Sequence, residues 1–300
     1  MSELANLPTE ARNPASEHID EVSTLEMLRV IHTADQQAVA AVDRELPRIA
    51  AAVDAIAARI EAGGRLFYLG AGTSGRLGVL DASECPPTFN TPPDLVQGII
   101  AGGDVALRRS IERAEDSPEL GARDLEEAGF SRADALVGIA ASGRTPYVLG
   151  GLEHARKLGA LTIALTCVPD SPVASAAEIP IVPATGPEVV TGSTRMKAGT
   201  ATKLVLNMLS TGALIRLGYV YGNLMVNVQP TNTKLADRAA RIIAAITGLD
   251  YAAAAQLLGK AESVKTAVVM QKLSLSREGA EERLRNTHGR LKDALGTRTT

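Results

Sequence analysis

The feature that most constrains this chain is a strand–loop–helix motif that occurs twice, with glycines and hydroxyl side chains in each loop. The first loop reads GAGTSGR over residues 70–76 and follows the apolar run LFYL. The second reads AASGRTP over 140–146 and follows ALVGI. Because a helical pattern follows each loop, backbone N–H groups without intrahelical acceptors gather there beside hydroxyl groups. These donors and the helix dipole favour an anion, so the two loops predict a phosphorylated small-molecule ligand.

From residue 65 onward, short apolar runs alternate with helical patterns, which is typical of a parallel sheet covered on both faces. The expected strands are 65–69, 95–100, 135–139, 161–165 and 179–182, with helices at 75–83, 105–114, 118–128 and 147–158. Ligands of such sheets lie beyond the carboxyl ends of the strands, where both loops fall. The predicted fold class is therefore α/β, with a doubly wound parallel sheet in a three-layer, flavodoxin-like sandwich.

Helical segments flank this unit on both sides. Residues up to about 20 read as a loosely ordered arm, and Ser23 with Glu26 has the spacing of a capping box that opens the first helix. A second helix is expected over 42–62, a long one over 196–217, and small ones over 233–246, 250–259, 261–272 and 277–295. The predicted domains are 1–54 (arm and helices), 55–230 (sheet) and 231–300 (a small helical domain).

The composition excludes several classes of protein. A net charge of −3, 3% aromatic residues and no tryptophan argue against nucleic-acid binding. We see no signal peptide and no membrane-spanning stretch, which predicts a soluble cytoplasmic protein with no membrane partner. Cys85 and Cys167 do not suggest a disulfide framework, and no ligand cluster has zinc spacing, so no metal is predicted.

Two glutamates are candidates for acid–base chemistry. Glu84 lies two residues before Pro86 and Glu115 three residues before Pro118, where we expect a helix to end. Two carboxylates near one phosphate pocket suit proton transfer, although solvated helix ends are the simpler reading. Ten residues of helix from Ser74 would carry Glu84 about 15 Å away. The helix must therefore be short or bent, or Glu84 must serve the pocket of a neighbouring subunit.

Two cations precede the long helix at 196–217. Arg195 and Lys197 oppose the helix dipole there, which indicates a bound anion such as a second carboxylate or phosphate. His288 lies in a turn-like stretch and could reach a neighbouring site, although a packing role is the simpler reading. The Ser and Thr residues of the two loops could likewise be simple N-caps, but two loops in one orientation favour phosphate binding.

Five blocks of the sequence resemble a known family. In chain order they are GAGTSGR, DASECPPT, AEDS, AASGRTPYV and TGSTRMKAGTA. They look like those of the N-acetylmuramic acid 6-phosphate etherases, and more broadly like the sugar-isomerase (SIS) phosphosugar-binding domain and the glucokinase regulatory protein. The resemblance runs from about Ile19 to the C-terminus and weakens after about residue 275.

The resemblance implies a cytoplasmic bacterial homodimer of cell-wall sugar (peptidoglycan) recycling that needs no cofactor. The implied reaction cleaves the D-lactyl ether of N-acetylmuramic acid 6-phosphate, by elimination and hydration, into N-acetylglucosamine 6-phosphate and D-lactate. By analogy Glu84 protonates the departing lactate and Glu115 is the base at carbon 2, although the residues alone allow the reverse. Arg195 or Lys197 would meet the lactyl carboxylate. The implied phosphate and sugar contacts are Gly72, Thr73, Ser74, Ser142, Gly143 and Thr145.

Two other functions fit the same fold. A phosphosugar isomerase would also use a glutamate at carbon 2, but it would need no acid at carbon 3. A non-catalytic phosphosugar sensor would need neither glutamate. A repressor would in addition carry a basic helix-turn-helix module, which the acidic N-terminal region lacks.

Overall fold

A computed structural model describes residues 8–109, 111 and 114–296 of the chain. Two compact units divide it: a sheet unit (residues 1–83 and 94–211) and a helical unit (84–93 and 212–300). The sequence predicts boundaries near 54 and 230. The units divide instead within two long helices, α3 (Gly72–Phe89) and α8 (Lys197–Arg216), and the N-terminal helices group with the sheet.

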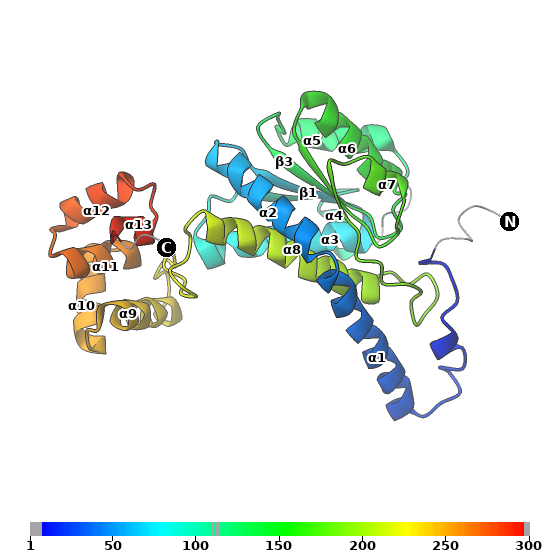
Figure 1. Cartoon of the computed structure of the whole chain (residues 1–300), viewed down its shortest axis with the longest axis horizontal. Coiled ribbons are helices and arrows are strands. Elements are labelled where there is room, and N and C mark those ends of the chain that lie inside the picture. Colours follow the sequence, from blue (N-terminus) through cyan, green and yellow to red (C-terminus); the bar gives the residue numbers. More distant parts are fainter. Residues whose placement is uncertain (1–7, 110, 112–113, 297–300) are drawn as a thin grey trace. The chain divides into compact units, whose positions relative to one another are not determined.

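A five-stranded parallel sheet forms the centre of the sheet unit (Figure 1). Its strands are β1 (Leu66–Gly70), β2 (Val96–Ile100), β3 (Ala135–Ile139), β4 (Leu161–Leu165) and β5 (Ile179–Ile181). They lie in the order β2-β1-β3-β4-β5. Gly70 is in register with Ile100 on one side and with Ile139 on the other, so these strands end together. The predicted α/β class and the parallel sheet are confirmed.

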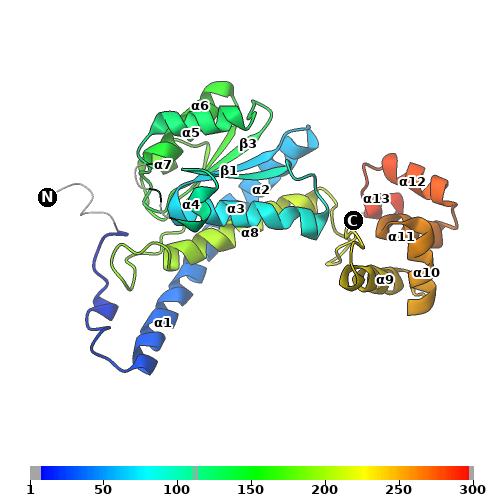
Figure 2. The same cartoon turned by 180° about the vertical axis from the view of Figure 1, so that it is seen from behind.

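Helices cover both faces of the sheet (Figures 1 and 2). One layer holds α5 (Pro118–Glu127), α6 (Pro146–Leu158) and α7 (Pro172–Ser175); the other holds α2 (Leu46–Glu61), α3 and α8. Phe67 and Leu69 join the core beneath α5 and α6. Tyr68 points to the opposite face, where its hydroxyl donates to Asp81 of α3 at 2.8 Å. All of β1 is therefore buried, as a central strand of a three-layer sandwich requires.

The N-terminal region is better ordered than the sequence predicts. The capping box of Ser23 and Glu26 is confirmed and opens α1 (Thr24–Asp43). A short 3-10 helix, η2 (Pro14–Ser16), precedes it. The Ser16 hydroxyl donates to the carbonyl of Val189 at 2.8 Å. The expectation of a loosely ordered arm is thus wrong for this part of the segment, because partners far along the chain fix it.

Two helices differ from their predicted lengths. The helix expected over 75–83 runs from Gly72 to Phe89 and includes Pro86 and Pro87. Burial of Phe89 favours continuation, and the Asn90 N–H donates to the carbonyl of Pro86 at 2.8 Å. The helix expected over 105–114 appears as α4 (Val105–Arg108). Residues 110, 112 and 113 lie outside the described part of the chain.

The helical unit is a bundle around its own apolar core, to which Ile243, Ala254 and Val268 contribute. Its helices are α9 (Thr233–Thr247), α10 (Tyr251–Ala261), α11 (Val264–Leu273), α12 (Arg277–Arg285) and α13 (Leu291–Ala294). Polar side chains cap the first four of them at Asn232, Asp250, Ser263 and Ser276. The single helix expected over 277–295 is wrong, because His288 (φ 51°) and Gly289 (φ 71°) turn the chain between α12 and α13.

Among the described residues, no one helix combines the length and apolar character needed to cross a membrane. Only α9 and α10 taken together pass that test, and they meet at a bend of 109°.

Candidate active site

Both glycine–hydroxyl loops lie at the point where the strand order reverses. The chain moves outward from β1 to β2 and then returns to the other side of β1 with β3. The ligand crevice of such a sheet lies beyond the carboxyl ends of the strands at this reversal. Because Gly70 and Ile139 are paired, the two predicted loops leave the sheet side by side.

The first loop is tighter than predicted, since α3 already begins at Gly72. Gly75 is the first residue of this turn to donate within it, to the carbonyl of Ala71 at 3.2 Å. The N–H groups of Gly72, Thr73 and Ser74 therefore precede the helical ladder. Gly70 and Gly75 approach so closely that a Cβ on Gly75 would lie 2.6 Å from the carbonyl oxygen of Gly70. This contact seats the helix directly on the end of β1.

The second loop presents a hydroxyl that its helix does not use. Thr145 occupies the N-cap position of α6, but its side chain makes no capping hydrogen bond. The Thr145 hydroxyl is therefore not a simple N-cap, and it can form a hydrogen bond with a ligand. Gly143 has a φ of 71° and packs against Ser171, so a side chain would be strained and would collide there. Ser142 and Thr145 are both half-buried.

Glu115 lies beside this second loop. Its backbone carbonyl accepts the N–H of Tyr147, in the first turn of α6, at 3.0 Å. Its side chain is exposed. Glu115 occupies a turn before α5 and not the helix end that we expected, because α4 stops at Arg108. The structure thus brings Glu115 and the second loop together.

The first turn of α8 contacts both the first loop and the segment that precedes the helix. A Cβ on Gly199 of α8 would lie 3.7 Å from Cγ2 of Thr73 and 3.5 Å from the carbonyl oxygen of Thr194. Arg195 is exposed on this segment. The structure therefore places Arg195 on the same edge of the sheet as the two loops.

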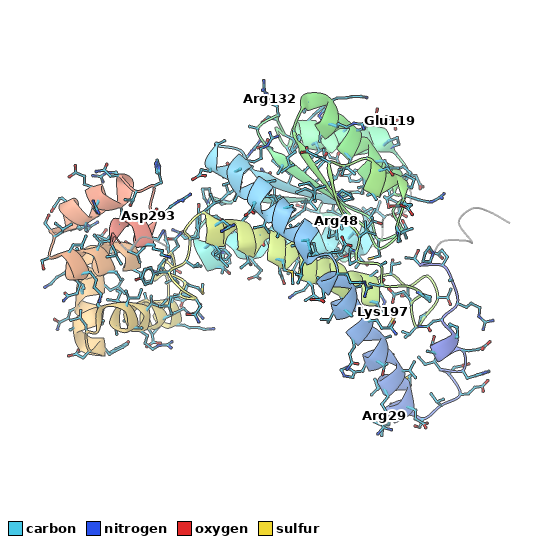
Figure 3. All side chains as sticks on the ribbon, in the orientation of Figure 1. Arg29, Arg48, Glu119, Arg132, Lys197 and Asp293 are labelled. Atoms are coloured by element: carbon cyan, nitrogen blue, oxygen red, sulfur yellow. The ribbon has the colours of Figure 1, made fainter. Side chains whose placement is uncertain are left out.

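Lys197 differs from the solvated base that its position suggests. It is 1% exposed, and its Nζ donates to Oε1 of Gln37 at 3.0 Å and to the carbonyl of Thr185 at 2.9 Å (Figure 3). Burial lowers the pKa of this ammonium, and Glu188 partly offsets that effect. Its hydrogen bonds go to groups of the protein itself. The sequence gives no local signal for Glu188, which lies nine residues before Lys197 and fits no capping motif.

Glu84 lies well along α3 and is exposed. The helix is neither short nor ended by Pro86 at this point, so the ten residues from Ser74 correspond to about 15 Å along the axis. Of the three possibilities stated for Glu84, a short helix is therefore wrong, and a bent helix or a role in the pocket of a neighbouring subunit remains.

The remaining candidate residues are a cysteine and a histidine, and their surroundings give neither of them a clear role in catalysis. Burial raises the pKa of the Cys167 thiol to about 12, which disfavours a nucleophilic thiolate. His288 stands in the turn between α12 and α13. Within the part of the chain that the structure describes, no three His, Cys, Asp or Glu side chains gather as they would around a metal ion.

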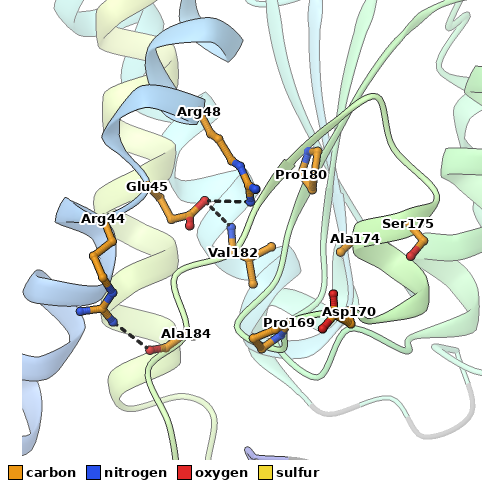
Figure 4. A pocket seen from close by; sticks show the side chains of 10 residues that line it. All are labelled: Arg44, Glu45, Arg48, Pro169, Asp170, Ala174, Ser175, Pro180, Val182 and Ala184. Atoms are coloured by element: carbon orange, nitrogen blue, oxygen red, sulfur yellow. Dashed lines mark hydrogen bonds and ion pairs between the residues drawn. The ribbon is translucent and has the colours of Figure 1, made fainter.

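A separate cavity of about 550 Å³ lies near β5 (Figure 4). Arg44, Arg48 and Asp170 line it together with Glu45, whose carboxylate accepts the N–H of Val182 at 3.0 Å. Since Arg48 also pairs with Glu45 at 3.6 Å, much of the charge here is compensated internally. The predicted site residues do not line this cavity.

The sheet order and the paired helix-start loops define an SIS-domain protein, and comparison with family models agrees. Residues 48–156 match the glucokinase regulatory protein N-terminal SIS domain, and residues 122–212 match the SIS domain. A phosphoheptose isomerase from Francisella tularensis shares the fold, with a TM-score of 0.50, 22% identity, and coverage of 64% of this chain and 98% of that one.

Curated relatives narrow the class to one family. An N-acetylmuramic acid 6-phosphate etherase from Aeromonas hydrophila is 56% identical over 96% of this chain and 97% of its own length. Proteins of the same name from Aliivibrio fischeri (54% identity, 98% of each chain) and Clostridium beijerinckii (53% identity, 97% of this chain and 96% of that one) also match. The chain belongs to the N-acetylmuramic acid 6-phosphate etherase family.

Proposed function

We propose that this protein is a carbon–oxygen lyase that cleaves the D-lactyl ether of N-acetylmuramic acid 6-phosphate. The products are N-acetylglucosamine 6-phosphate and D-lactate, and the reaction serves the recycling of cell-wall sugar. The observation that carries the proposal is the attachment of Glu115 to the start of α6, beside a loop suited to phosphate. Identity above 50% to etherases over nearly the whole chain supports the choice of substrate.

The two helix starts bind the 6-phosphate and neighbouring sugar hydroxyls in this proposal. The N–H groups at the start of α3 and the hydroxyls of Ser74, Ser142 and Thr145 are donors for phosphate oxygens. Gly72, Thr73 and Gly143 shape the same surface. A phosphate fixed there orients the sugar, which makes the reaction effectively unimolecular.

Glu115 is the base. In the open-chain sugar, the carbonyl at carbon 1 acidifies the hydrogen on carbon 2, so a carboxylate can remove it. The electron pair left on carbon 2 forms a double bond to carbon 3 while the bond from carbon 3 to the lactyl oxygen breaks. The Glu115 side chain is exposed beside the second loop, so it is accessible to a sugar bound there.

The departing lactate needs a proton, because an alkoxide is a poor leaving group. Glu84 supplies it in our assignment, so Glu84 must be protonated when Glu115 is ionised. Water then adds across the double bond: its hydroxyl goes to carbon 3 and a proton returns to carbon 2. Arg195 binds the lactyl carboxylate by charge and hydrogen bonding.

The location of Glu84 supports a homodimer in which each copy completes the other's site. On a continuous α3, Glu84 lies about 15 Å along the helix from the phosphate-binding turn, which exceeds the reach of one sugar. The Glu84 that protonates lactate therefore comes from the second copy. We also place the protein in the cytoplasm, since a sugar phosphate is too strongly charged to cross a bilayer unaided.

Helix α1, whose place is seen in Figure 1, carries exposed apolar side chains that suit contact with that second copy. Leu25, Leu28 and Val39 are exposed by 59%, 53% and 58%. At 100° per residue they lie on one side of α1, on a different side from the buried Ala34 and Ala38. A helix with apolar residues on two sides is suited to pack against its own unit and a partner at once.

The test is D-lactate release from N-acetylmuramic acid 6-phosphate by the purified chain, followed with a D-lactate-specific dehydrogenase. We expect lactate and N-acetylglucosamine 6-phosphate in equal amounts. Conversion of an amino-sugar phosphate to its ketose without lactate would favour an isomerase. Tight binding of the sugar phosphate by folded protein without any turnover would favour a sensor.

A further inference from the structure

The start of α8 is capped by a buried carboxylate. Glu188 is 1% exposed, and its two oxygens accept the N–H groups of Lys197 and Ala198 at 2.9 and 3.0 Å. An anion at a helix start is favoured by the dipole and satisfies two donors that the helix cannot. These hydrogen bonds join the two ends of the segment 188–197, which therefore forms a closed loop.

Lys197 ties this loop to α1. Its ammonium donates to Gln37 of α1 and to the carbonyl of Thr185, on the chain that leads into the loop. A buried ammonium is costly unless its donors are satisfied and a negative charge is near. Glu188 and Asp35 supply the negative charge. The arrangement is therefore specific and resists displacement of the loop.

The N-terminal segment also contacts the same loop. Asn13 donates to the carbonyl of Pro187 at 3.3 Å, and the Ser16 hydroxyl donates to that of Val189. A Cβ on Gly192 would lie 3.0 Å from Oε2 of Glu10. These contacts come from residues more than 170 positions away, so they hold the loop by tertiary structure and not by local preference.

The central part of the loop lies against the first turn of α8. The N–H of Ser193 donates to Val190, and that of Met196 donates to Ser193, which makes a compact turn. The exposed Arg195 lies in this turn, and Thr194 approaches Gly199, which also meets Thr73. A small shift of the buried anchor would move Arg195 relative to the first glycine loop.

We propose that Glu188, Lys197 and Gln37 are positioning residues that hold Arg195 in place to read the lactyl carboxylate, so that Lys197 itself does not touch the substrate. This inference rests on the proposed function. It makes the network responsible for recognising the lactyl group and not the phosphate, which the two helix starts bind.

The product provides the test, because N-acetylglucosamine 6-phosphate carries the phosphate but no lactyl group. We would measure KM and kcat for lactate release, and the Kd of the product, for the wild type and Lys197→Met. The expected result is a KM raised by roughly tenfold or more, as for loss of a charge-assisted contact, with a product Kd within about threefold of wild type. Lys203→Met, on an exposed position of α8, is the matched control and should match the wild type.

Gln37→Leu guards against a folding defect, since Gln37 is exposed and its loss leaves the core intact. It should show the same split between substrate and product, with a smaller change in KM. Equal loss of substrate and product affinity in both variants, or no change in either, would overturn the positioning role. A wild-type protein that releases no lactate would instead refute the proposed function itself, and the inference with it.

Discussion

The backbone N–H of Tyr147 donates to the carbonyl of Glu115 at 3.0 Å, so the start of α6 and the turn before α5 are fixed to each other. Tyr147 is fully buried, and its hydroxyl donates to Asp124 of α5 at 2.6 Å. Burial and this carboxylate raise the pKa of Tyr147 above its ordinary value. The second glycine–hydroxyl loop and the proposed base thus adjoin one packed pair of helices, α5 and α6.

Glu115→Gln should lower kcat by roughly 10²- to 10⁴-fold, since an amide cannot accept the proton from carbon 2. In deuterated water the wild type should place deuterium on carbon 2 of the product sugar, and the variant should not. Glu153→Gln, an exposed position on α6, is the control. If Glu115→Gln had the same kcat as the wild type, Glu115 would not be the base.

Mixed dimers should reveal whether Glu84 acts across the subunit interface. Glu84→Gln and Glu115→Gln should each be inactive alone. If each site takes Glu115 from one copy and Glu84 from the other, mixing them should restore about a quarter of wild-type activity, because half of the dimers are hybrids with one intact site of two. No activity after subunit exchange, with hybrid formation verified by an affinity tag carried by only one of the two variants, would place both glutamates in one chain's site.

Several elements could be predicted from the sequence because their causes are local. The capping box of Ser23 and Glu26 predicts the start of α1, and the apolar runs before the glycine loops predict β1 and β3. Pro86 misled the prediction for α3, since local preference favours an end there while the buried Phe89 favours continuation. Tertiary contacts decided that outcome.

The candidate site was predictable in its residue types but not in all their roles. The charge of Lys197 at a helix start suggests that it binds an anionic ligand. Its partners are instead Gln37 of α1 and Thr185, which lies in the loop after β5. Neither contact has a sequence pattern. Arg195, two residues earlier, has the exposure that the predicted role requires.

The buried Glu188 should matter for stability as well as for recognition. Glu188→Gln should lower the free energy of unfolding of the sheet unit by roughly 2 kcal/mol, through loss of one charge-assisted bond and of the interaction with the helix dipole. Glu178→Gln, an exposed position, should have little effect. Adding Lys197→Met to Glu188→Gln should cost about 1 kcal/mol less than the sum of the single changes, because no lone buried charge remains. Strict additivity in denaturant titrations would show that the two groups do not interact.

Lys265 should make the stability of the helical unit depend on pH. Its Nζ donates to the carbonyls of Gly218 and Gly289 at 3.4 and 2.6 Å, and burial lowers its pKa from 10.5 to about 8. Between pH 8 and 10.5 the unfolded chain holds the proton more tightly, so stability should rise with pH there, by at most about 1.4 kcal/mol per pH unit.

The difference between wild type and Lys265→Met isolates this contribution from other titrating groups. The rise should vanish in Lys265→Met and persist in Lys272→Met, which changes an exposed lysine of the same helix. Identical pH profiles for wild type and Lys265→Met would mean that the buried amine does not titrate in this range.

The most direct test is to run the reaction on N-acetylmuramic acid 6-phosphate in water enriched in a heavy oxygen isotope. The masses of both products are then measured by mass spectrometry. Elimination followed by hydration breaks the bond between carbon 3 and the lactyl oxygen, so the label should enter the sugar at carbon 3 and lactate should remain unlabelled. Label in the lactate would mean that water attacks the lactyl carbon, which would contradict the roles given to Glu84 and Glu115.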